Sequence, residues 1–372
     1  PFSITTTGGT GSQAFFNISP GTYVITELVP SGWDLTGLVC TDPTNDTTFN
    51  GAVATINLAD NESISCTYTN TKQPTLTLVK TVVNDNGGTA VANNFQGKID
   101  GGNVSWGVPQ TVSVGEHTAS ETSFAGYTAS AWGGDCAVGG SVTLAAGEAK
   151  TCTITNDDNA PSLTLNKIVV NDNGGTAVES AWTLSATGPT GFSGAGPSVS
   201  NGASFDAGAY TLSESGPSGY AASAWSCVGG TQNGSNITVG LGESATCTIT
   251  NDDVAPTLKL VKVVTNNNGG TQTSVDWTLT AAGSGGFSDA GNSTTFHPVI
   301  AGVGYALSES IVAGYDAGSW SCNAGLLIGS TVTLGLGQNA TCTITNDDQA
   351  AHLIIIKEVI NDNGGTKTAG DF

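Results

Sequence analysis

The 372-residue sequence contains no methionine and no arginine, and only 10% of its residues are charged. All nine basic residues are lysines, which leaves a formal net charge of −21 at pH 7. Nucleic-acid binding requires basic patches, so this balance excludes nucleic acid as a partner. No apolar run approaches the roughly 20 residues of a membrane-spanning helix. We therefore expect no membrane insertion in this segment.

The sequence also lacks a sustained 3.6-residue apolar period, which argues against long helices. It is instead rich in Gly, Thr, Ser, Val and Asn, with 52 glycines. Many short strands joined by Gly and Asn turns have this composition. The sequence therefore predicts an all-β fold.

The eight cysteines include no CxxC motif and have no histidine near them, so zinc binding is a poor interpretation. They occur as one pair in each sequence repeat, which favours one disulfide per domain. The predicted disulfides are Cys40–Cys66, Cys136–Cys152, Cys227–Cys247 and Cys322–Cys342. Disulfides persist in oxidising compartments, so we expect an extracellular, cell-surface location.

An NDNGG or NNNGG turn marks an internal repeat. The turns begin at Asn84, Asn171, Asn266 and Asn361, spaced by 87, 95 and 95 residues. About seven short strands per repeat predict an Ig-like two-sheet sandwich of roughly 100 residues. We expect a linear array of a first domain lacking its first strand (1–72), second to fourth domains (73–158, 159–253, 254–348) and a terminal segment (349–372) that begins another domain.

Strand alternation places three polar residues of each repeat on the apolar face of their strands. In the third domain they are Lys167, Glu214 and Asn251. The equivalent sets are Lys80, Glu121 and Asn156; Lys262, Glu309 and Asn346; and Lys357, Glu27 and Asn70. Lys and Glu are almost never buried unless they are paired, so each set calls for an explanation.

Two explanations of these sets stay open. The first is a buried Lys–Glu ion pair with Asn as a hydrogen-bond partner. The second is chemical: a desolvated, neutral lysine attacks the Asn carboxamide, a protonated Glu shuttles the proton, and an amide forms with loss of ammonia. This reaction would be the only catalysis, because no enzyme site recurs in the repeats.

The GxYxxxE motif, present as GTYVITE and GAYTLSE, is followed by a Gly-aromatic step. With a first-strand Lys and a last-strand Asn, it resembles the Cna-B-type, prealbumin-like domains of SpaA-type pilins and adhesins. The resemblance implies prealbumin-like sandwiches and a self-formed Lys–Asn isopeptide bond in each domain. The sequence departs from the family in its cysteine pairs and in the HTASE stretch that ends at Glu121.

The fourth set is divided between the two ends of the sequence. Joining Phe372 to Pro1 restores the 95-residue period and aligns Phe2 with Trp182. The terminal segment can therefore supply the first strand of the first domain in a neighbouring copy, which would share a strand head-to-tail and build a filament. Equally, the sequence can be a window of a longer repeat protein, with Lys357 in an ordinary intrachain set.

Oxygen-rich turns raise the question of calcium. The NDNGG turns and NDD linkers offer carboxylates for Ca²⁺, but Asn-Gly is also typical of a hairpin turn. Asn267 replaces the aspartate found at Asp85, Asp172 and Asp362, which favours the turn and no cofactor.

These observations predict a structural subunit or segment of an extracellular, pilus-like filament or surface stalk. The alternative is an adhesin whose variable loops bind a cell or polysaccharide ligand. The candidate loops are Ser185–Ala207 and Ala281–Pro298, and both read as ordinary loops. We expect no enzyme beyond autocatalytic isopeptide formation.

Overall fold

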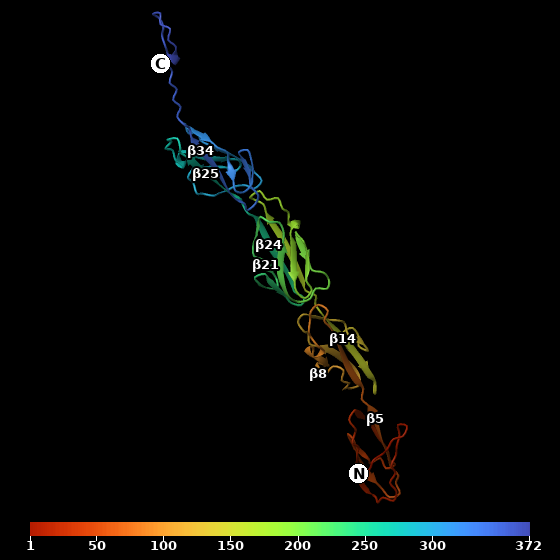
Figure 1. Cartoon of the computed structure of the whole chain (residues 1–372). Helices are drawn as coiled ribbons and strands as arrows, with labels where there is room; N and C mark the ends of the chain where they lie inside the picture. Colours follow the sequence, from red (N-terminus) through yellow and green to blue (C-terminus); the bar gives the residue numbers. More distant parts are fainter. The chain divides into compact units, whose positions relative to one another are not determined.

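Three of the four lysine-bearing apolar stretches form nine-residue strands in the computed structural model, which describes residues 1–372. Alternate residues of each strand, such as Leu163 and Leu165, are buried, as expected for a strand covered on one face. Each of these strands pairs in parallel with the last strand of its own domain (Figure 1). The pairs are β6 (Thr75–Val83) with β14 (Ala149–Asp158), β15 (Ser162–Val170) with β24 (Ser244–Asp253), and β25 (Thr257–Thr265) with β34 (Asn339–Asp348).

The chain divides into two compact units, Pro1–Ala160 and Pro161–Phe372, and each is described by itself. Strands dominate both units, and the only helices are single 3₁₀ turns. The prediction of an all-β fold is confirmed. No helix is long and apolar enough to cross a membrane.

The second domain consists of two sheets, β13-β10-β7-β8 and β11-β14-β6-β9, with β12 also paired to β14. Its core contains Leu76, Leu78 and Leu144. Its remaining elements are η1 (Ala92–Asn94), β7 (Gly97–Ile99), β8 (Gly102–Val104), β9 (Gln110–Thr111), β10 (Gly115–Glu121), β11 (Tyr127–Ala129), β12 (Gly133–Gly134) and β13 (Ser141–Leu144).

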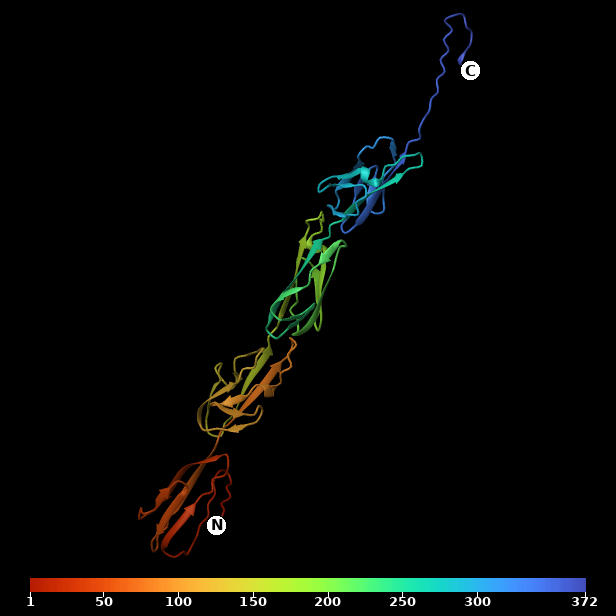
Figure 2. The same ribbon diagram turned by 90° about the vertical axis from the view of Figure 1, so that its left-hand side faces the viewer.

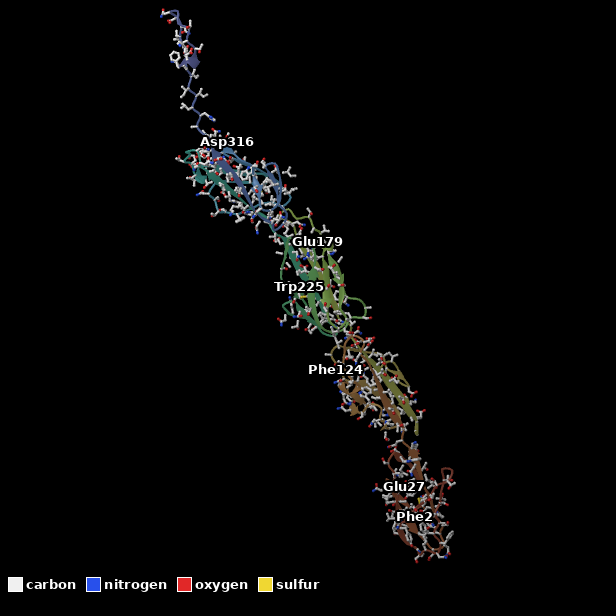
Figure 3. All side chains as sticks on the ribbon, viewed as in Figure 1. Phe2, Glu27, Phe124, Glu179, Trp225 and Asp316 are labelled. Carbon is white, nitrogen blue, oxygen red and sulfur yellow. A yellow bond between two sulfur atoms is a disulfide. The ribbon has the colours of Figure 1, made fainter.

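The third domain repeats this plan with sheets β18-β15-β24-β20 and β17-β16-β19-β23-β22, and β21 also pairs with β24. Its other elements are η2 (Glu179–Ala181), β16 (Thr183–Thr187), β17 (Phe192–Ala195), β18 (Ser198–Ser200), β19 (Gly208–Ser215), β20 (Tyr220–Ala222), β21 (Ser226–Val228), β22 (Thr231–Asn233) and β23 (Asn236–Val239). Trp225, labelled in Figure 3, is buried in its core.

The fourth domain has sheets β28-β25-β34-β30 and β27-β26-β29-β33-β32, with β31 also paired to β34. Its other elements are η3 (Ser274–Asp276), β26 (Thr278–Ala282), β27 (Phe287–Ala290), β28 (His297–Pro298), β29 (Gly304–Glu309), β30 (Tyr315–Ala317), β31 (Ser321–Cys322), β32 (Leu326–Ile328) and β33 (Thr331–Thr333). The stretches 185–207 and 281–298, which we expected as loops, contain the paired strands β17, β18, β27 and β28. Variable sequence there does not mean irregular structure.

The first domain is open on one side. Its sheets are β1-β4-β3 and β2-β5, formed by β1 (Gly21–Thr26), β2 (Trp33–Thr41), β3 (Thr48–Asn50), β4 (Val53–Leu58) and β5 (Ser65–Lys72). Strand β5 corresponds to β14, β24 and β34, but the parallel first strand is missing from its side. As a result, Ala54 and Ile56 are the only buried hydrophobic residues of this domain, and Phe16 is 83% exposed.

The terminal segment leaves β34 as a single extended run without strand partners (Figures 1 and 2). Its apolar residues are open to solvent, with Leu353 and Ile355 85% and 84% exposed. The one regular element is η4 (Ala369–Asp371). The segment therefore has the apolar pattern of a buried strand, but its apolar side chains are not packed against a core.

Candidate functional site

Each complete domain holds a buried lysine against a glutamate across its two sheets. In the third domain, Lys167 Nζ on β15 lies 2.7 Å from Glu214 Oε2 on β19. The lysine side chain is fully covered, and Asn251 on β24 is also buried. Strand parity therefore placed these three side chains correctly in the interior.

The asparagine joins the set in two different ways in the second and fourth domains. Lys80 Nζ lies 2.5 Å from Glu121 Oε2 and donates a second hydrogen bond to Asn156 Oδ1, so the amine contacts both partners. In the fourth domain Glu309 accepts from Lys262 through Oε2 at 2.5 Å and from Asn346 Nδ2 through Oε1 at 2.7 Å. There the glutamate bridges the amine and the carboxamide.

Burial is the main cause of a shift in the lysine pKa values. It lowers the pKa of Lys80, Lys167 and Lys262 below the usual value, although the neighbouring glutamate partly opposes the shift. A lowered pKa makes the neutral, nucleophilic amine more accessible. Burial therefore lowers the free-energy cost of reaching the neutral amine that amide formation needs.

An aromatic ring covers each lysine, and the sequence analysis missed this feature. Lys80 Nζ lies 4.1 Å from the Phe95 ring centroid and Lys167 Nζ lies 4.8 Å from that of Trp182. The same distance is 4.7 Å for Lys262 and Trp277, and 4.4 Å for Lys357 and Phe372. Each ring lies eleven residues after the start of its turn, a fixed spacing that could have revealed it. The ring excludes water and attracts the ammonium by a cation–π contact.

This spacing corrects the alignment across the two ends of the chain. Phe372, which directly follows η4, is the equivalent of Trp182, which directly follows η2. We expected Phe2 to be the counterpart of Trp182, and this alignment is wrong. The sequence pattern misled because Phe2 and Phe372 are both aromatic and only two positions apart across the join.

In the first domain the site has no lysine. Asn70 Nδ2 donates to Glu27 Oε1 at 2.5 Å, and Figure 3 labels Glu27. Glu27 Oε2 and Asn70 Oδ1 are buried and have no hydrogen-bond partner. In the second domain the equivalent atoms, Oε2 of the glutamate and Oδ1 of the asparagine, both bind the lysine ammonium. Lys357, the third member of the predicted set, is exposed in the terminal segment.

All four cysteine pairs form disulfides: Cys40–Cys66, Cys136–Cys152, Cys227–Cys247 and Cys322–Cys342. Trp225 and Trp320 pack in the same cores as the disulfides that follow them. Trp33, which precedes Cys40 in the sequence, has a different position. It pairs in register with Lys72, the position that Tyr220 occupies opposite Asp253.

His117 replaces the tyrosine of the GxYxxxE motif without loss of its contact. Tyr210 donates its hydroxyl hydrogen to the carbonyl oxygen of Asp206, four residues earlier. His117 Nε2 lies 2.9 Å from the carbonyl oxygen of Ser113, also four residues earlier, and its Nδ1 lies 2.6 Å from Asp100 Oδ2. The departure at HTASE therefore leaves the position of Glu121 unaltered.

In each complete domain, a buried aspartate at the end of the last strand binds the NDNGG or NNNGG turn. Asp253 accepts hydrogen bonds from the backbone N–H groups of Asp172, Asn173 and Gly175 at 3.0, 3.0 and 2.6 Å. Burial alone would raise the pKa of Asp253, but these donors bring it below its usual value. Asp158 and Asp348 make the same contacts, which the sequence analysis did not foresee.

The calcium question centres on this turn. The carboxylates of Asp172, Asp252 and Asp253 come within 4.8 Å of one another, as do those of Asp85, Asp157 and Asp158. Desolvation by neighbouring atoms and the nearby carboxylates raise the pKa of Asp172. The second turn residue contributes only its N–H to the buried aspartate, so Asn267 replaces aspartate without disturbing the turn.

The chain matches the models of a known protein family. A family model described as a prealbumin-like fold domain of SpaA type matches residues 72–154, 158–249 and 253–344, and a second model of this description matches 1–72. The protein is a tandem array of such domains with four disulfides, and it belongs to the SpaA-type prealbumin-like family. No curated protein matches the chain.

The solved structures that match this chain include the following three. The Bacillus anthracis TIE protein is 14% identical, with 90% of this chain and 69% of that chain covered and a TM-score of 0.40. The pilus adhesin SpaC of Lactobacillus rhamnosus GG is 10% identical, with coverages of 91% and 57% and a TM-score of 0.25. The major pilin T-13 of Streptococcus pyogenes is 11% identical, with coverages of 50% and 96% and a TM-score of 0.25. The chain thus spans little more than half of the SpaC chain.

Proposed function

We propose that the chain is a structural segment of an extracellular, pilus-like filament or surface stalk, in which each domain resists unfolding under tension. The observation that carries the proposal is the parallel pairing of first and last strands with the Lys–Glu–Asn set between them. Tension enters the third domain at the start of β15 and leaves at the end of β24. A Lys167–Asn251 bond would carry this tension directly, so residues 168–250 would be bypassed.

Amide formation in this site is the finer part of the proposal. Neutral Lys167 Nζ attacks the Asn251 side-chain carbonyl carbon, Glu214 transfers the proton to the leaving nitrogen, and ammonia departs as the amide forms. No cofactor, oxidant or reductant is required. Burial of the lysine and the bridging carboxylate of the fourth domain support this step. A covalent link slows unfolding, which decides survival outside the cell more than equilibrium stability does.

Intact mass of the disulfide-reduced chain tests this step. We expect the mass to lack one ammonia for each complete domain, and one fewer for the Glu214→Gln variant. The exposed Glu243→Gln substitution in the same domain serves as the matched control and should retain every loss. An unmodified wild-type mass would overturn amide formation and leave three buried ion pairs.

The joint between successive segments is the second finer part. We propose that a first strand adds in parallel to β5 of the first domain, and that in a head-to-tail filament the terminal segment of a second copy supplies it. Lys357 would then meet Glu27 Oε2 and Asn70 Oδ1, two buried atoms without partners. The exposed apolar residues of the segment and the uncovered core of the first domain support this pairing.

Denaturing electrophoresis of concentrated full-length chain tests the joint. After boiling in detergent and reductant, we expect a ladder of multimers that disappears in Lys357→Ala and in Asn70→Ala. The exposed Lys150→Ala variant should keep the ladder. Wild-type chain that is monomeric both before and after boiling would refute the head-to-tail joint.

A further inference from the structure

In the complete domains, a tyrosine and an aspartate together bind the NDNGG turn through hydrogen bonds. The buried Asp253 accepts three backbone N–H groups of the turn, as described above. The Tyr220 hydroxyl donates to Asn171 Oδ1 at 2.6 Å and accepts from the Ala177 N–H at 3.0 Å. The fit is tight, because a Cβ added to Gly175 would lie 2.4 Å from the Tyr220 hydroxyl oxygen. This Tyr–Asp pair is the turn receptor.

The receptor is the same in each complete domain. Register pairs Tyr127 with Asp158, Tyr220 with Asp253 and Tyr315 with Asp348. In each pair the aspartate lies on the last strand and the tyrosine on the strand paired with it. Both residues lie next to the turn that follows the first strand. The receptor therefore belongs to the domain body, whereas the turn arrives with the first strand.

The turn of the terminal segment already has the geometry that this receptor binds. Asn361 Nδ2 donates to the Lys367 carbonyl oxygen at 2.8 Å, as Asn171 Nδ2 does to the Ala177 carbonyl oxygen at 2.9 Å. Gly364 has a φ of 79°, close to the 96° of its equivalent Gly174. The segment thus presents N–H groups that require a carboxylate acceptor.

The first domain carries a different pair at the receptor position. Trp33 pairs in register with Lys72, both residues are exposed, and Trp33 has no hydroxyl group. An ammonium group has donors only, so Lys72 cannot accept the N–H groups that Asp253 accepts. An ion pair between Lys72 and Asp362 would lie in solvent and be weak, whereas hydrogen bonds to a carboxylate are strong. Binding the turn at Lys72 is therefore less favourable than binding it at an aspartate.

We propose that Trp33 and Lys72 make the first domain selective against first strands with an NDNGG turn, including that of the terminal segment. The strand it prefers carries the lysine of the site but lacks the NDNGG turn, so no turn N–H group has to give up an acceptor. The terminal segment, conversely, matches a domain body with the Tyr–Asp receptor. This inference rests on the proposed strand addition to β5. It makes the joint between two copies weaker than a joint with the preferred strand.

Binding of two labelled peptides to the full-length chain at low concentration tests the selectivity. The long peptide contains residues 349–372, and the short peptide stops at 360, before the turn. The acceptors are the wild-type chain, the W33Y/K72D variant and the matched control W33Y/K72N, whose amide has the shape of the carboxylate but not its charge. The short peptide reports whether the β5 edge is intact in each protein.

We expect the long peptide to bind W33Y/K72D about tenfold or more tightly than wild type and the control, since three N–H groups regain a charged acceptor. The short peptide should bind all three proteins equally. A gain of equal size for both peptides, or no gain, would overturn the selectivity while leaving strand addition in place. Absence of binding by either peptide to any protein would instead refute strand addition, and the inference with it.

A second measurement uses only the wild-type chain, so it does not depend on the folding of a variant. Replacing Gly365 by N-methylglycine in the long peptide removes the N–H equivalent to the Gly175 donor, which makes the shortest receptor contact. We expect the wild-type chain to bind the methylated and unmodified peptides equally. Weaker binding of the methylated peptide would show that the wild-type chain accepts a hydrogen bond from the turn, and would overturn the proposal.

Discussion

Asp253 offers a direct measure of how strongly the turn holds the first strand of the third domain. Its carboxylate accepts backbone N–H groups from Asp172, Asn173 and Gly175. A hydrogen bond to a charged group contributes about 1.5–3 kcal/mol, but Asp172 is exposed, so water can replace part of the loss. For Asp253→Ala we therefore expect the free energy of opening to fall by about 2–4 kcal/mol.

Hydrogen exchange monitored by mass spectrometry can localise this effect in the full-length chain. Peptides from β15 and β24 should lose protection in Asp253→Ala and lose less in Asp253→Asn, which keeps one acceptor oxygen. The exposed neighbour Asp252→Ala is the matched control. Unchanged protection of β15 in Asp253→Ala would refute the view that this carboxylate anchors the turn.

The same carboxylate predicts a dependence on pH. Donor N–H groups lower the pKa of Asp253 in the folded state, so its contribution is present above the unfolded value of 3.8. That contribution is lost as the pH falls through the lower, folded-state pKa. Acid should therefore reduce protection in wild type but not further in Asp253→Ala.

Two further predictions concern the disulfides and His117. Removing the Cys227–Cys247 link by a double alanine substitution opens a loop with a sequence separation of 20 and should destabilise the third domain by about 3 kcal/mol, measured by urea unfolding; a change below about 1 kcal/mol would contradict this. The hydrogen bond with Asp100 raises the pKa of His117 despite its burial, so its stabilisation is complete below the ordinary value of 6.5 and is lost as the pH rises through the folded-state pKa. Exchange from β10 should accelerate beyond the intrinsic rate as the pH rises above 6.5, and His117→Gln should remove that excess; an excess that persists would contradict this role.

The repeat period, the cysteine pairs and strand alternation were legible in the sequence because they depend on local spacing. Alternation alone placed Lys80, Lys167 and Lys262 in the interior, since successive side chains of a strand face opposite sides. The aromatic rings over the lysines recur at a fixed spacing and could also have been found. These features required no knowledge of which strands are neighbours.

The remaining contacts depend on which strands are neighbours in the fold. Sequence order separates β15 from β24, yet their parallel pairing brings Lys167 close to Asn251 and the turn onto Asp253. Likewise, Trp33 precedes a cysteine in the sequence as Trp225 does, and only the register with Lys72 revealed that Trp33 occupies the position of Tyr220. The sequence by itself determined which residues face inward, because that depends on alternation along one strand; the tertiary structure decided which of them meet, because that depends on pairing between distant strands.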